Sequence, residues 1–496
     1  MTAATKPDRS EVKLVVLISL LAALHVFVFT AAFPFFNSVD EQLHFDLAVR
    51  YSQGQVPRSL DPFTPEALRY IALFSSLAYL ATDAQYPDGK LPPPPWTQPM
   101  EKVIPQMLGR ERDWGIYTNT ETSQPPLYYS AAGAWWLAGS LAGMDGERLL
   151  YWLRFLNIPI VVGVVWLAWL ASRKMFPENI FVRLAVPLLI AFIPQTAFYS
   201  INSDIAMPLV FGGAFLLLLK FWAAEIPAMR PAVATGLVLG ATFLTKISSL
   251  PLLAAAALFI AVKMFRLHRS GKLRPALSAL LALSLCALLP MLGWMAWCRT
   301  TFGDLTGSAV KIHMLGWTDR PVTEWFHHPL FSLHGLWVFL GDTFATFWQG
   351  EFLWRRQPLA LPALDAFYKV LTLVLLVLAV VSVGKRRVAE SRVGLVLALA
   401  CLAVSLAFFA LLSMKYDFHD CFYPSQAHPF FTSGRLYLGG LIPILILLAA
   451  GLDFALRKIS LKAKFVLLAA LLLFMLAGEI AVDWRVFPCE YNWYHL

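Results

Sequence analysis

Long apolar runs separated by short polar segments dominate this sequence. Several runs reach the roughly 20 residues that a helix needs to cross a bilayer, and their apolar residues are too continuous for a surface helix. The pattern predicts eleven membrane-spanning helices, at residues 14–32, 153–171, 181–198, 205–221, 232–246, 249–265, 275–298, 363–383, 393–412, 434–452 and 464–481. The alternative counts residues 126–143 as a twelfth span.

The basic residues decide between these two topologies. If the N-terminus is inside and 126–143 does not cross, the short basic loops fall on the inner side, as the positive-inside bias requires. Examples are Arg173-Lys174 and Lys385-Arg386-Arg387. A crossing at 126–143 would put several such loops outside. The net charge of +9 therefore reports membrane orientation and needs no nucleic-acid partner.

The composition places the chain among integral membrane proteins. It is 58% hydrophobic and 14% charged over 496 residues, with a mean hydropathy of +0.62, which excludes a soluble protein. Lys6, Arg9 and Lys13 precede the first run, and no small-residue cleavage site follows it, so we expect a retained signal anchor. We predict an all-α, polytopic fold in which residues 1–496 form a single transmembrane domain, with no separate soluble domain.

Two long segments, 33–152 and 299–362, lie on the predicted outer side. The first contains two apolar runs, 67–81 and 130–143, which are too short to cross and too apolar for water, so we expect them to lie in the membrane interface. The second contains several histidines whose spacing matches no ligand motif, and we predict no metal site there. The five cysteines show no metal spacing either. Cys421 and Cys489 lie outside the spans, and their pairing stays open.

An acidic stretch directly follows the first predicted span. Asp40, Glu41 and His44 lie where that span meets water. Ionised groups cost about 2.5–3.5 kcal/mol each near the centre of a membrane helix and less toward the interface, and such groups are usually functional. If 40–48 is helical, Asp40 and His44 are neighbours on one face. The alternative is an N-cap formed by Ser38 or Asp40, but a cap needs only one polar side chain.

Further polar residues fall at the same membrane face. Asp204, Lys246 and Arg435 each lie beside the outer end of a predicted span. Taken singly, each is explained by a solvated loop or a snorkelling side chain. Together, carboxylates and cations at one interface suit an anionic lipid headgroup bound beside a general base.

Six short motifs resemble those of the GT-C polytopic glycosyltransferases, in the same order along the chain. That superfamily includes protein O-mannosyltransferases, bacterial lipid A aminoarabinose transferases and a branch of uncharacterised bacterial membrane proteins. The matching segments are Asp40-Glu41-Gln42-Leu43-His44-Phe45, Pro125-Pro126-Leu127-Tyr128-Tyr129, Arg154, Asn202-Ser203-Asp204, Phe243-Leu244-Thr245-Lys246 and Gly434-Arg435-Leu436-Tyr437. Two positions depart from the pattern: Gln124 stands where the family often has His or Lys, and Leu436 interrupts a Gly-Arg-Tyr motif.

The resemblance implies an enzyme that transfers a sugar from a polyprenyl-phosphate donor to a lipid-linked, glycan or protein acceptor. The reaction is expected at the outer, periplasmic face of a bacterial inner membrane, by a single inverting displacement. The catalytic candidates are Asp40, Glu41, His44 and Asp204. The candidates for binding phosphate or substrate are Arg435, Lys246, Arg154, Gln124 and Tyr128. No cofactor or metal is required in principle, although Asp204 with Asp40 offers carboxylates for a divalent ion.

Two other functions stay open. A transporter or flippase would use embedded ionisable residues as a proton relay, but the sequence has no duplicated halves and no matched pair of broken helices. A glycan polymerase of another fold would share the large outer segment. It would not predict an acidic pair directly after the first span.

Overall fold

The computed structural model of the chain describes residues 9–37, 40–76, 84–86, 88, 90–355, 357–385 and 388–495. Among these residues, nine helical segments are long and apolar enough to cross a membrane. They are α1 (Arg9–Ala32), α7–α8 (Gly146–Arg154, Asn157–Met175), η3–α10 (Ser203–Ala206, Met207–Ala223), η4–α12 (Ile247–Ser249, Leu250–Arg269), α13 (Leu273–Phe302), α17 (Pro362–Lys385), α18 (Ala389–Lys415), η6–α19 (Gly434–Gly440, Leu441–Ala455) and α20 (Leu461–Asp483).

Two shorter apolar helices occupy the other predicted spans. They are α9 (Ile180–Ala191) and α11 (Met229–Thr245). The prediction of an all-α, polytopic membrane protein is confirmed, whereas the count of eleven crossings stays a prediction. The third predicted span is shorter than expected because the chain leaves the helix before Pro194, which has no N–H to donate. It resumes as the 3₁₀ helix η2 (Thr196–Tyr199), which the Gln195 side chain caps.

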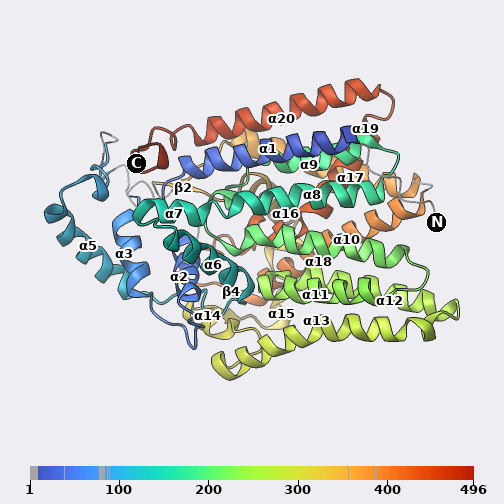
Figure 1. The fold of residues 1–496 in the computed structure, drawn as a ribbon, viewed down its shortest axis with the longest axis horizontal. Coiled ribbons are helices and arrows are strands. Elements are labelled where there is room, and N and C mark those ends of the chain that lie inside the picture. The colour runs from blue at the N-terminus through green and yellow to red at the C-terminus, as the bar shows by residue number, and fades with distance from the viewer. Residues whose placement is uncertain are drawn as a thin grey trace.

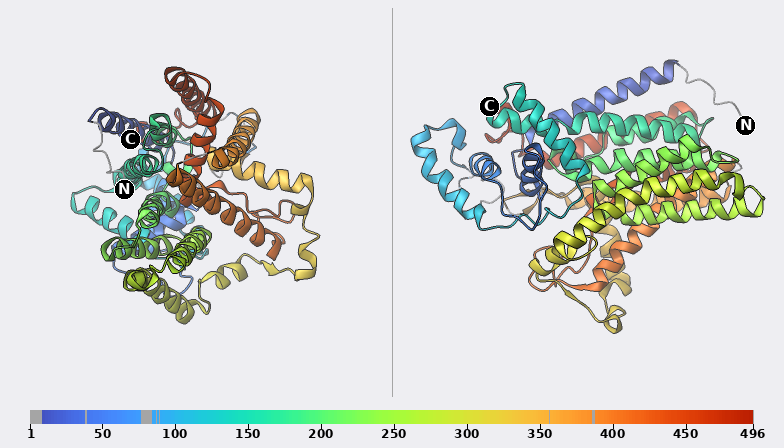
Figure 2. Two further views of the ribbon diagram at one scale, coloured as in Figure 1. Left: turned by 90° about the vertical axis from the view of Figure 1, so that its right-hand side faces the viewer. Right: turned by 60° about the horizontal axis from the view of Figure 1, so that its bottom comes forward.

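The helices run side by side as an elongated bundle (Figure 1). Helix α19 lies inside it, with 12 of its 15 residues buried. Helix α16 (Leu333–Gln349) has a different direction: seen along the bundle, it runs sideways between the periphery and the centre (Figure 2, left). Its first residue, Leu333, is 90% exposed, whereas Phe347 and Trp348 near its end are buried. The end of α16 therefore reaches the interior of the protein.

Buried polar contacts attach the peripheral helix α20. The Nε2 atom of His25 on α1 lies 2.7 Å from Oε2 of Glu479 on α20, and the hydroxyl of Tyr199 donates to the same carboxylate. These groups are at most 9% exposed. Such pairs are costly to leave unsatisfied in an apolar environment, so they fix the position of α20 against α1 and η2.

Helices of the first outer segment gather at one end of the bundle (Figure 1). They are α2 (Glu41–Ser52), α3 (Pro65–Phe74), η1 (Pro95–Thr97), α5 (Met100–Gly115) and α6 (Leu127–Leu141). Helix α6 covers the disputed run 126–143. At about 1.5 Å per residue its 15 residues are shorter than the ~30 Å of a bilayer core. A Cβ at Gly133 of α6 would lie 2.6–2.9 Å from backbone atoms of residues 48–52, so α6 packs closely on α2.

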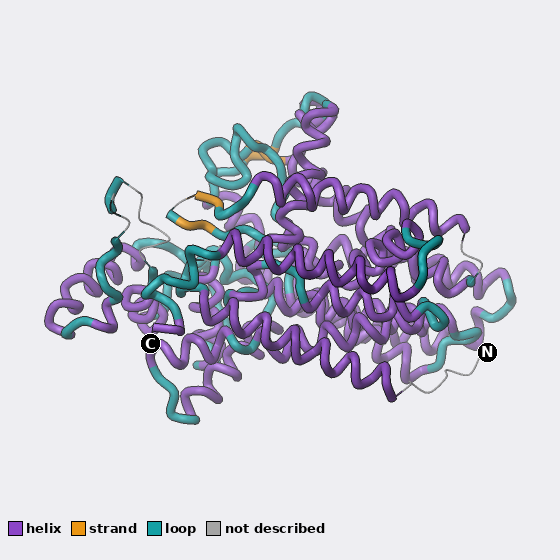
Figure 3. The backbone as a smooth tube through the Cα atoms, turned by 90° about the horizontal axis from the view of Figure 1, so that it is seen from above, coloured by secondary structure: helices purple, strands orange, loops and turns teal. Residues whose placement is uncertain are grey.

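The second outer segment is tied to other parts of the chain by short strands. Its elements are α14 (Ser308–Met314), β1 (Thr318–Asp319), α15 (Val322–Trp325), η5 (Pro329–Phe331), α16, β2 (Leu353–Trp354) and β3 (Gln357–Pro358). Strand β1 pairs antiparallel with β4 (Tyr416–Asp417), which follows α18, and β2 pairs with β3. The long loops gather toward the C-terminal end of the bundle (Figure 3).

Several sequence features noted above lie outside the described residues, namely Lys6, Ser38, residues 77–81 and Arg386-Arg387. The structure answers one open question: all five cysteines are free, so Cys421 and Cys489 do not form a disulfide. Within the described ranges, no group of three or more His, Cys, Asp or Glu side chains is arranged to hold a metal ion.

The two ends of the bundle make the predicted topology testable. Lys272 lies between α12 and α13, at the end opposite His495 and the first outer segment (Figure 1). In a variant without the native cysteines, a membrane-impermeant maleimide should label His495→Cys in intact cells, because a charged reagent does not cross the bilayer. It should label Lys272→Cys only after permeabilisation. Labelling of Lys272→Cys from outside would contradict the topology.

Candidate functional site

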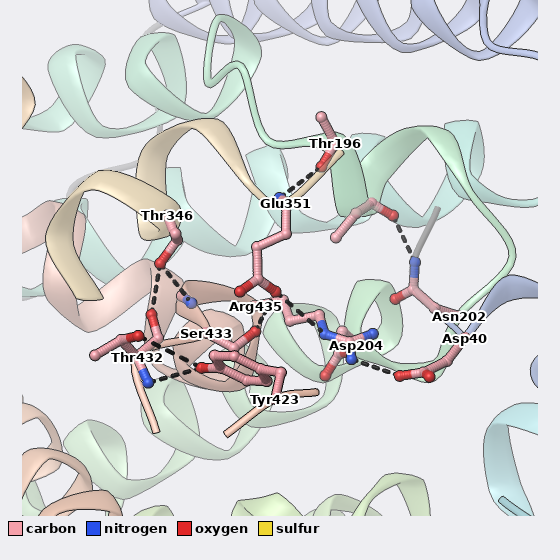
Figure 4. A network of polar contacts seen from close by, with 12 residues as sticks. Asp40, Thr196, Asn202, Asp204, Thr346, Glu351, Tyr423, Thr432, Ser433 and Arg435 are labelled. Atoms are coloured by element: carbon pink, nitrogen blue, oxygen red, sulfur yellow. Dashed lines mark hydrogen bonds and ion pairs between the residues drawn. The ribbon is translucent and has the colours of Figure 1, made fainter. Parts of the chain in front are cut away.

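Short 3₁₀ helices bring the polar residues of distant segments together. Helices η3, η4 and η6 each run directly into a membrane helix, and η2 lies next to η3 in the chain. The Asn202 side chain fixes the start of η3 by accepting a hydrogen bond from the backbone N–H of Ile205 at 3.2 Å. The start of α2 and the end of α16 complete this region, and Figure 4 shows the resulting network.

Asp40 and Arg435 form the ion pair at the centre of this network. Nη2 of Arg435 donates to Oδ2 of Asp40 at 2.5 Å. Asp40 directly precedes α2, but its side chain makes no capping hydrogen bond. Its φ of 64° lies in the left-handed region, which is unfavourable for a non-glycine residue. The backbone is thus held in a conformation in which the carboxylate meets Arg435 instead of capping the helix.

The Asp40–Arg435 pair is partly exposed to solvent, and nearby cations keep Asp40 ionised. The side chains of Asp40 and Arg435 are 32% and 18% exposed. Burial alone would raise the pKa of Asp40, but the cations Arg435 and Lys311 outweigh it and hold the pKa well below its usual range. Asp40 is therefore ionised, and it is a poor proton acceptor while Arg435 stays bound to it.

A second ion pair joins η3 to the start of η4. Nζ of Lys246 donates to Oδ1 of Asp204 at 2.7 Å, and both side chains are at most 8% exposed. Oδ2 of Asp204 is buried and has no hydrogen-bond partner among the described residues. The Asp204 charge acts on Arg435, so the two pairs are electrostatically linked. Four residues that the sequence places at one membrane face are thus brought together: Asp40, Asp204, Lys246 and Arg435.

Glu351 is a further acidic residue of this network. Its Oε2 lies 3.8 Å from Nε of Arg435 and accepts a hydrogen bond from the Ser433 hydroxyl at 2.5 Å. Burial raises the pKa of Glu351, although Arg435 partly offsets this effect. Sequence reasoning missed Glu351 because it lies in the second outer segment, outside every motif. The available signal was an acidic residue directly after the apolar run that forms α16.

A contact between the two outer segments lies close enough to act on the charge of Asp40. Lys311 on α14 pairs with Glu121, which precedes α6. Burial would raise the pKa of Glu121, but Lys311 outweighs it and lowers the pKa to about 2. Nδ1 of His44 lies 2.7 Å from the Tyr129 hydroxyl, and burial lowers the pKa of His44 to about 4. His44 is therefore neutral at pH 7, and sequence reasoning did not find the role of Lys311.

Glu41 and Arg154 are paired with each other inside the protein. Nε and Nη2 of Arg154 each donate to the carboxylate at 2.7 Å. The remaining lone pairs of Glu41 accept the backbone N–H groups of Phe36 at 2.9 Å and Ile201 at 3.0 Å. Both residues are at most 1% exposed. This carboxylate has no free acceptor position for a substrate.

The other face of Arg154 binds the chain just after α1. Nη1 and Nη2 donate to the carbonyl groups of Phe33 and Pro34, at 2.5 and 2.8 Å. The guanidinium also lies over the Phe35 ring, 4.7 Å from its centroid. All these contacts are internal. Arg154 therefore joins α7 to the segment that leads into Asp40, and its role is to stabilise the fold.

Gln124 and Tyr128 lie at the start of α6 and outside the ion-pair network. Tyr128 is 3% exposed, and Oε1 of Gln124 is buried without a hydrogen-bond partner in the part of the chain that the structure describes. Among the contacts of the described residues, neither side chain joins Asp40 or Arg435. Their predicted binding roles stay predictions.

The chain is similar to one family of proteins and, in its fold, to solved structures. A family described as predicted membrane protein (DUF2142) matches residues 23–417. No curated protein matches. Among solved structures, the Archaeoglobus fulgidus oligosaccharyltransferase in complex with Zn and sulfate is 14% identical with a TM-score of 0.43, and its apo form is 13% identical with a TM-score of 0.39. Each alignment covers 95% of this chain but only 53% and 55% of the other, so the chain spans about half of their length.

The buried pair predicts a large loss of stability when it is broken. Arg154→Met leaves the Glu41 carboxylate buried without its cation, which costs about 3–5 kcal/mol. The thermal unfolding midpoint of the purified protein should fall accordingly. Lys174→Met is the matched control, because Lys174 pairs with Glu390 at the surface, where such a pair contributes about 0–1 kcal/mol. Equal midpoints for the two variants would contradict the structural role of Arg154.

Proposed function

The chain belongs to the DUF2142 family of predicted membrane proteins, and we propose that it is a membrane glycosyltransferase. In this proposal it transfers a sugar from a polyprenyl-phosphate donor to a lipid-linked, glycan or protein acceptor at the end of the bundle that carries the outer segments. The observation that carries the proposal is the partly exposed Asp40–Arg435 pair beside Lys246. The order of the six motifs that resemble GT-C glycosyltransferases supports it.

Donor binding uses the cation of the central pair. A phosphate group competes with Asp40 for the guanidinium of Arg435, because both are anionic oxygen ligands that accept charge-assisted hydrogen bonds. Lys246 lies beside this position and adds positive charge. Charge on the phosphate grows as the bond to the sugar breaks, so these cations stabilise the transition state more than the bound donor.

Proton transfer uses the partner that the phosphate displaces. When Arg435 turns to the phosphate, Asp40 loses its strongest cationic neighbour and its pKa rises toward the ordinary value. Asp40 then accepts the proton of the acceptor hydroxyl or amine. The acceptor atom attacks the anomeric carbon, and the sugar–phosphate bond breaks with its electron pair going to polyprenyl phosphate. A single displacement of this kind inverts the anomeric centre.

The proposal assigns the remaining residues as follows. Asp204 holds Lys246, His44 supports the start of α2 as a neutral residue, and Glu41 with Arg154 is structural. No metal is needed, because Asp40 and Asp204 are each paired with a cation that a divalent ion would first have to displace. We place the reaction at the outer face of a bacterial inner membrane, opposite the basic inner loops.

One observation favours the transporter alternative. His25 and Glu479 are ionisable residues within membrane-spanning helices, as a proton relay requires. They are joined to Tyr199 in a closed contact and lie apart from the Asp40–Arg435 pair in the chain and in the fold. A transport cycle does not need Asp40 as a base, so the two functions differ in the following prediction.

Asp40→Asn should separate binding from chemistry. The amide keeps the size of the side chain but loses its basicity, so turnover should fall by about 10²–10⁴-fold. Donor affinity should be retained or increased, because Arg435 no longer has an anionic competitor. Both are measured on purified protein, as release of polyprenyl phosphate from polyprenyl-phosphate sugars and as donor binding. Asp342→Asn, in a partly exposed pair with Lys369, is the control. Wild-type turnover in Asp40→Asn would remove Asp40 from this role.

Arg435→Ala should instead weaken the donor complex. It removes a charge-assisted contact worth about 1.5–3 kcal/mol, so donor affinity should fall by about 10- to 100-fold. Turnover should fall as well, because the charge on the phosphate grows as it leaves. Lys369→Ala removes a cation of the same partly exposed kind outside the site and should leave both quantities unchanged. Unchanged donor affinity in Arg435→Ala would contradict phosphate binding at this residue.

A further inference from the structure

Glu351 is held beside Arg435 by a closely built turn. The Gln195 side chain donates to the carbonyl groups of Thr346 and Phe347 at the end of α16, at 3.0 and 2.8 Å. The backbone N–H of Glu351 donates to the Thr196 hydroxyl at 3.2 Å (Figure 4). Gly350 between them has a φ of 76°, and a Cβ there would lie 2.2–2.3 Å from side-chain oxygens of Thr196 and Gln195. The fold thus specifies where this carboxylate lies.

Arg435 is fixed by the same end of α16. The Thr346 hydroxyl accepts the backbone N–H of Gly434 at 2.8 Å and donates to the carbonyl group of Thr432 at 2.7 Å. A Cβ at Gly434 would lie 1.9 Å from the backbone nitrogen of Phe347. The guanidinium is therefore presented between two carboxylates, Asp40 on one side and Glu351 on the other (Figure 4).

The charges of this cluster do not balance. Asp40, Asp204 and Glu351 contribute three carboxylates, and Arg435 and Lys246 contribute two cations. Glu121 and Lys311 form a neutral pair beside them. A phosphodiester would add one more negative charge to a cluster that already has an excess of one. Its binding is therefore opposed unless one carboxylate takes up a proton.

The distance from each carboxylate to its cation indicates which of the three takes up a proton most easily. Asp40 is bound at 2.5 Å by Arg435, and Asp204 is bound at 2.7 Å by Lys246. Among the ion pairs of the described residues, that of Glu351 is longer, at 3.8 Å from Nε of Arg435. The charged groups that act on Glu351 are Arg435 from η6, Asp40 from the start of α2 and Asp204 from η3. The polar groups that contact it are Ser433 before η6 and Thr196 on η2.

We propose that Glu351 binds the donor phosphate in its protonated form. A proton from solvent converts the carboxylate to the carboxylic acid when a prenyl phosphodiester binds at Arg435. The guanidinium is then released from this side, and the acid O–H donates to a phosphate oxygen. The net charge of the cluster with its bound phosphodiester then equals the net charge of the free cluster. The excess negative charge therefore no longer opposes binding. This inference rests on the proposed function and adds a binding residue and a proton-linked step to it.

The sign of the pH dependence follows from this coupling. Burial already raises the pKa of Glu351 in the free protein, and the bound phosphate raises it further. The affinity for the phosphodiester is therefore highest below the pKa that Glu351 has in the free protein. It falls as the pH rises from that value to the pKa that Glu351 has in the complex. A shift of one unit between the two states corresponds to about a tenfold change in affinity.

The test measures binding of farnesyl methyl phosphate to the purified full-length chain from pH 5 to pH 8. This phosphodiester carries a single charge over the whole range, so its own ionisation does not contribute. The affinity of the wild type should fall by about tenfold or more as the pH rises. Glu351→Gln should bind without pH dependence, near the acidic limit of the wild type. Glu324→Gln, in an exposed position of the same outer segment, should keep the wild-type profile.

Proton uptake gives a second measurement that needs no variant. Calorimetry of the same titration in two buffers of different ionisation enthalpy should show protons taken up by the wild type and none by Glu351→Gln. The wild-type pH profile in Glu351→Gln, or loss of its binding at every pH with an unchanged unfolding midpoint, would overturn the inference. So would binding to the wild type without proton uptake. Absence of binding to the wild type at every pH would overturn the proposed function as well.

Discussion

The buried pair between Glu41 and Arg154 holds the outer segment on the membrane bundle. Its hydrogen bonds reach the end of α1, the start of α2, the end of α7 and the chain before η3. A charge pair of this kind is stable inside a protein only when every donor and acceptor is satisfied, and here the carboxylate has four donors. Because Asp40 is next to Glu41 in the chain, this arrangement also fixes the position of Asp40. One of two adjacent acidic residues is thus used for the fold, and the other is left at the surface of the site.

The arrangement of the site explains how strong charges are tolerated near the membrane without a ligand. Each cation of the centre is paired with a carboxylate from a different segment. Unpaired ions at this depth would be costly, so each of these ion pairs stabilises the free protein. In the proposed function, a donor phosphate exchanges with one of these carboxylates and leaves the fold intact. The ion pairs that stabilise the free protein would then also be the sites of phosphate binding.

The positions of the helices were predictable from the sequence, and so was the face on which Asp40, Asp204, Lys246 and Arg435 lie. Both follow from the length of apolar runs, because a residue at the end of a span is fixed in depth by the span itself. The sequence did not predict that Glu41 is buried in an ion pair while Asp40 lies in the partly exposed site. Their side chains point in different directions at the start of α2, and only the packing of α7 decides which one is buried. Because both residues lie in the same short motif, no local pattern distinguishes their roles.

The sequence did not indicate that Lys311 and Glu351 belong to the site, for another physical reason. Both lie in the segment 299–362, whose path depends on contacts distant in sequence, such as the pairing of β1 with β4 and the attachment of Gly350 to η2. No local pattern encodes such contacts. The shortening of α9 was also missed, although Pro194 was visible, because proline is tolerated in many membrane helices.

The close approach of Gly434 to the end of α16 makes this glycine a marker for the geometry of the site. A Cβ at this position would overlap the backbone of Phe347, which cannot move without displacing the helix. Any other residue there would separate η6 from α16, and with it Arg435 from Glu351. In a homologous chain, glycine before the arginine therefore reports that the guanidinium still lies between its two carboxylates, and its replacement reports a site that has been rebuilt.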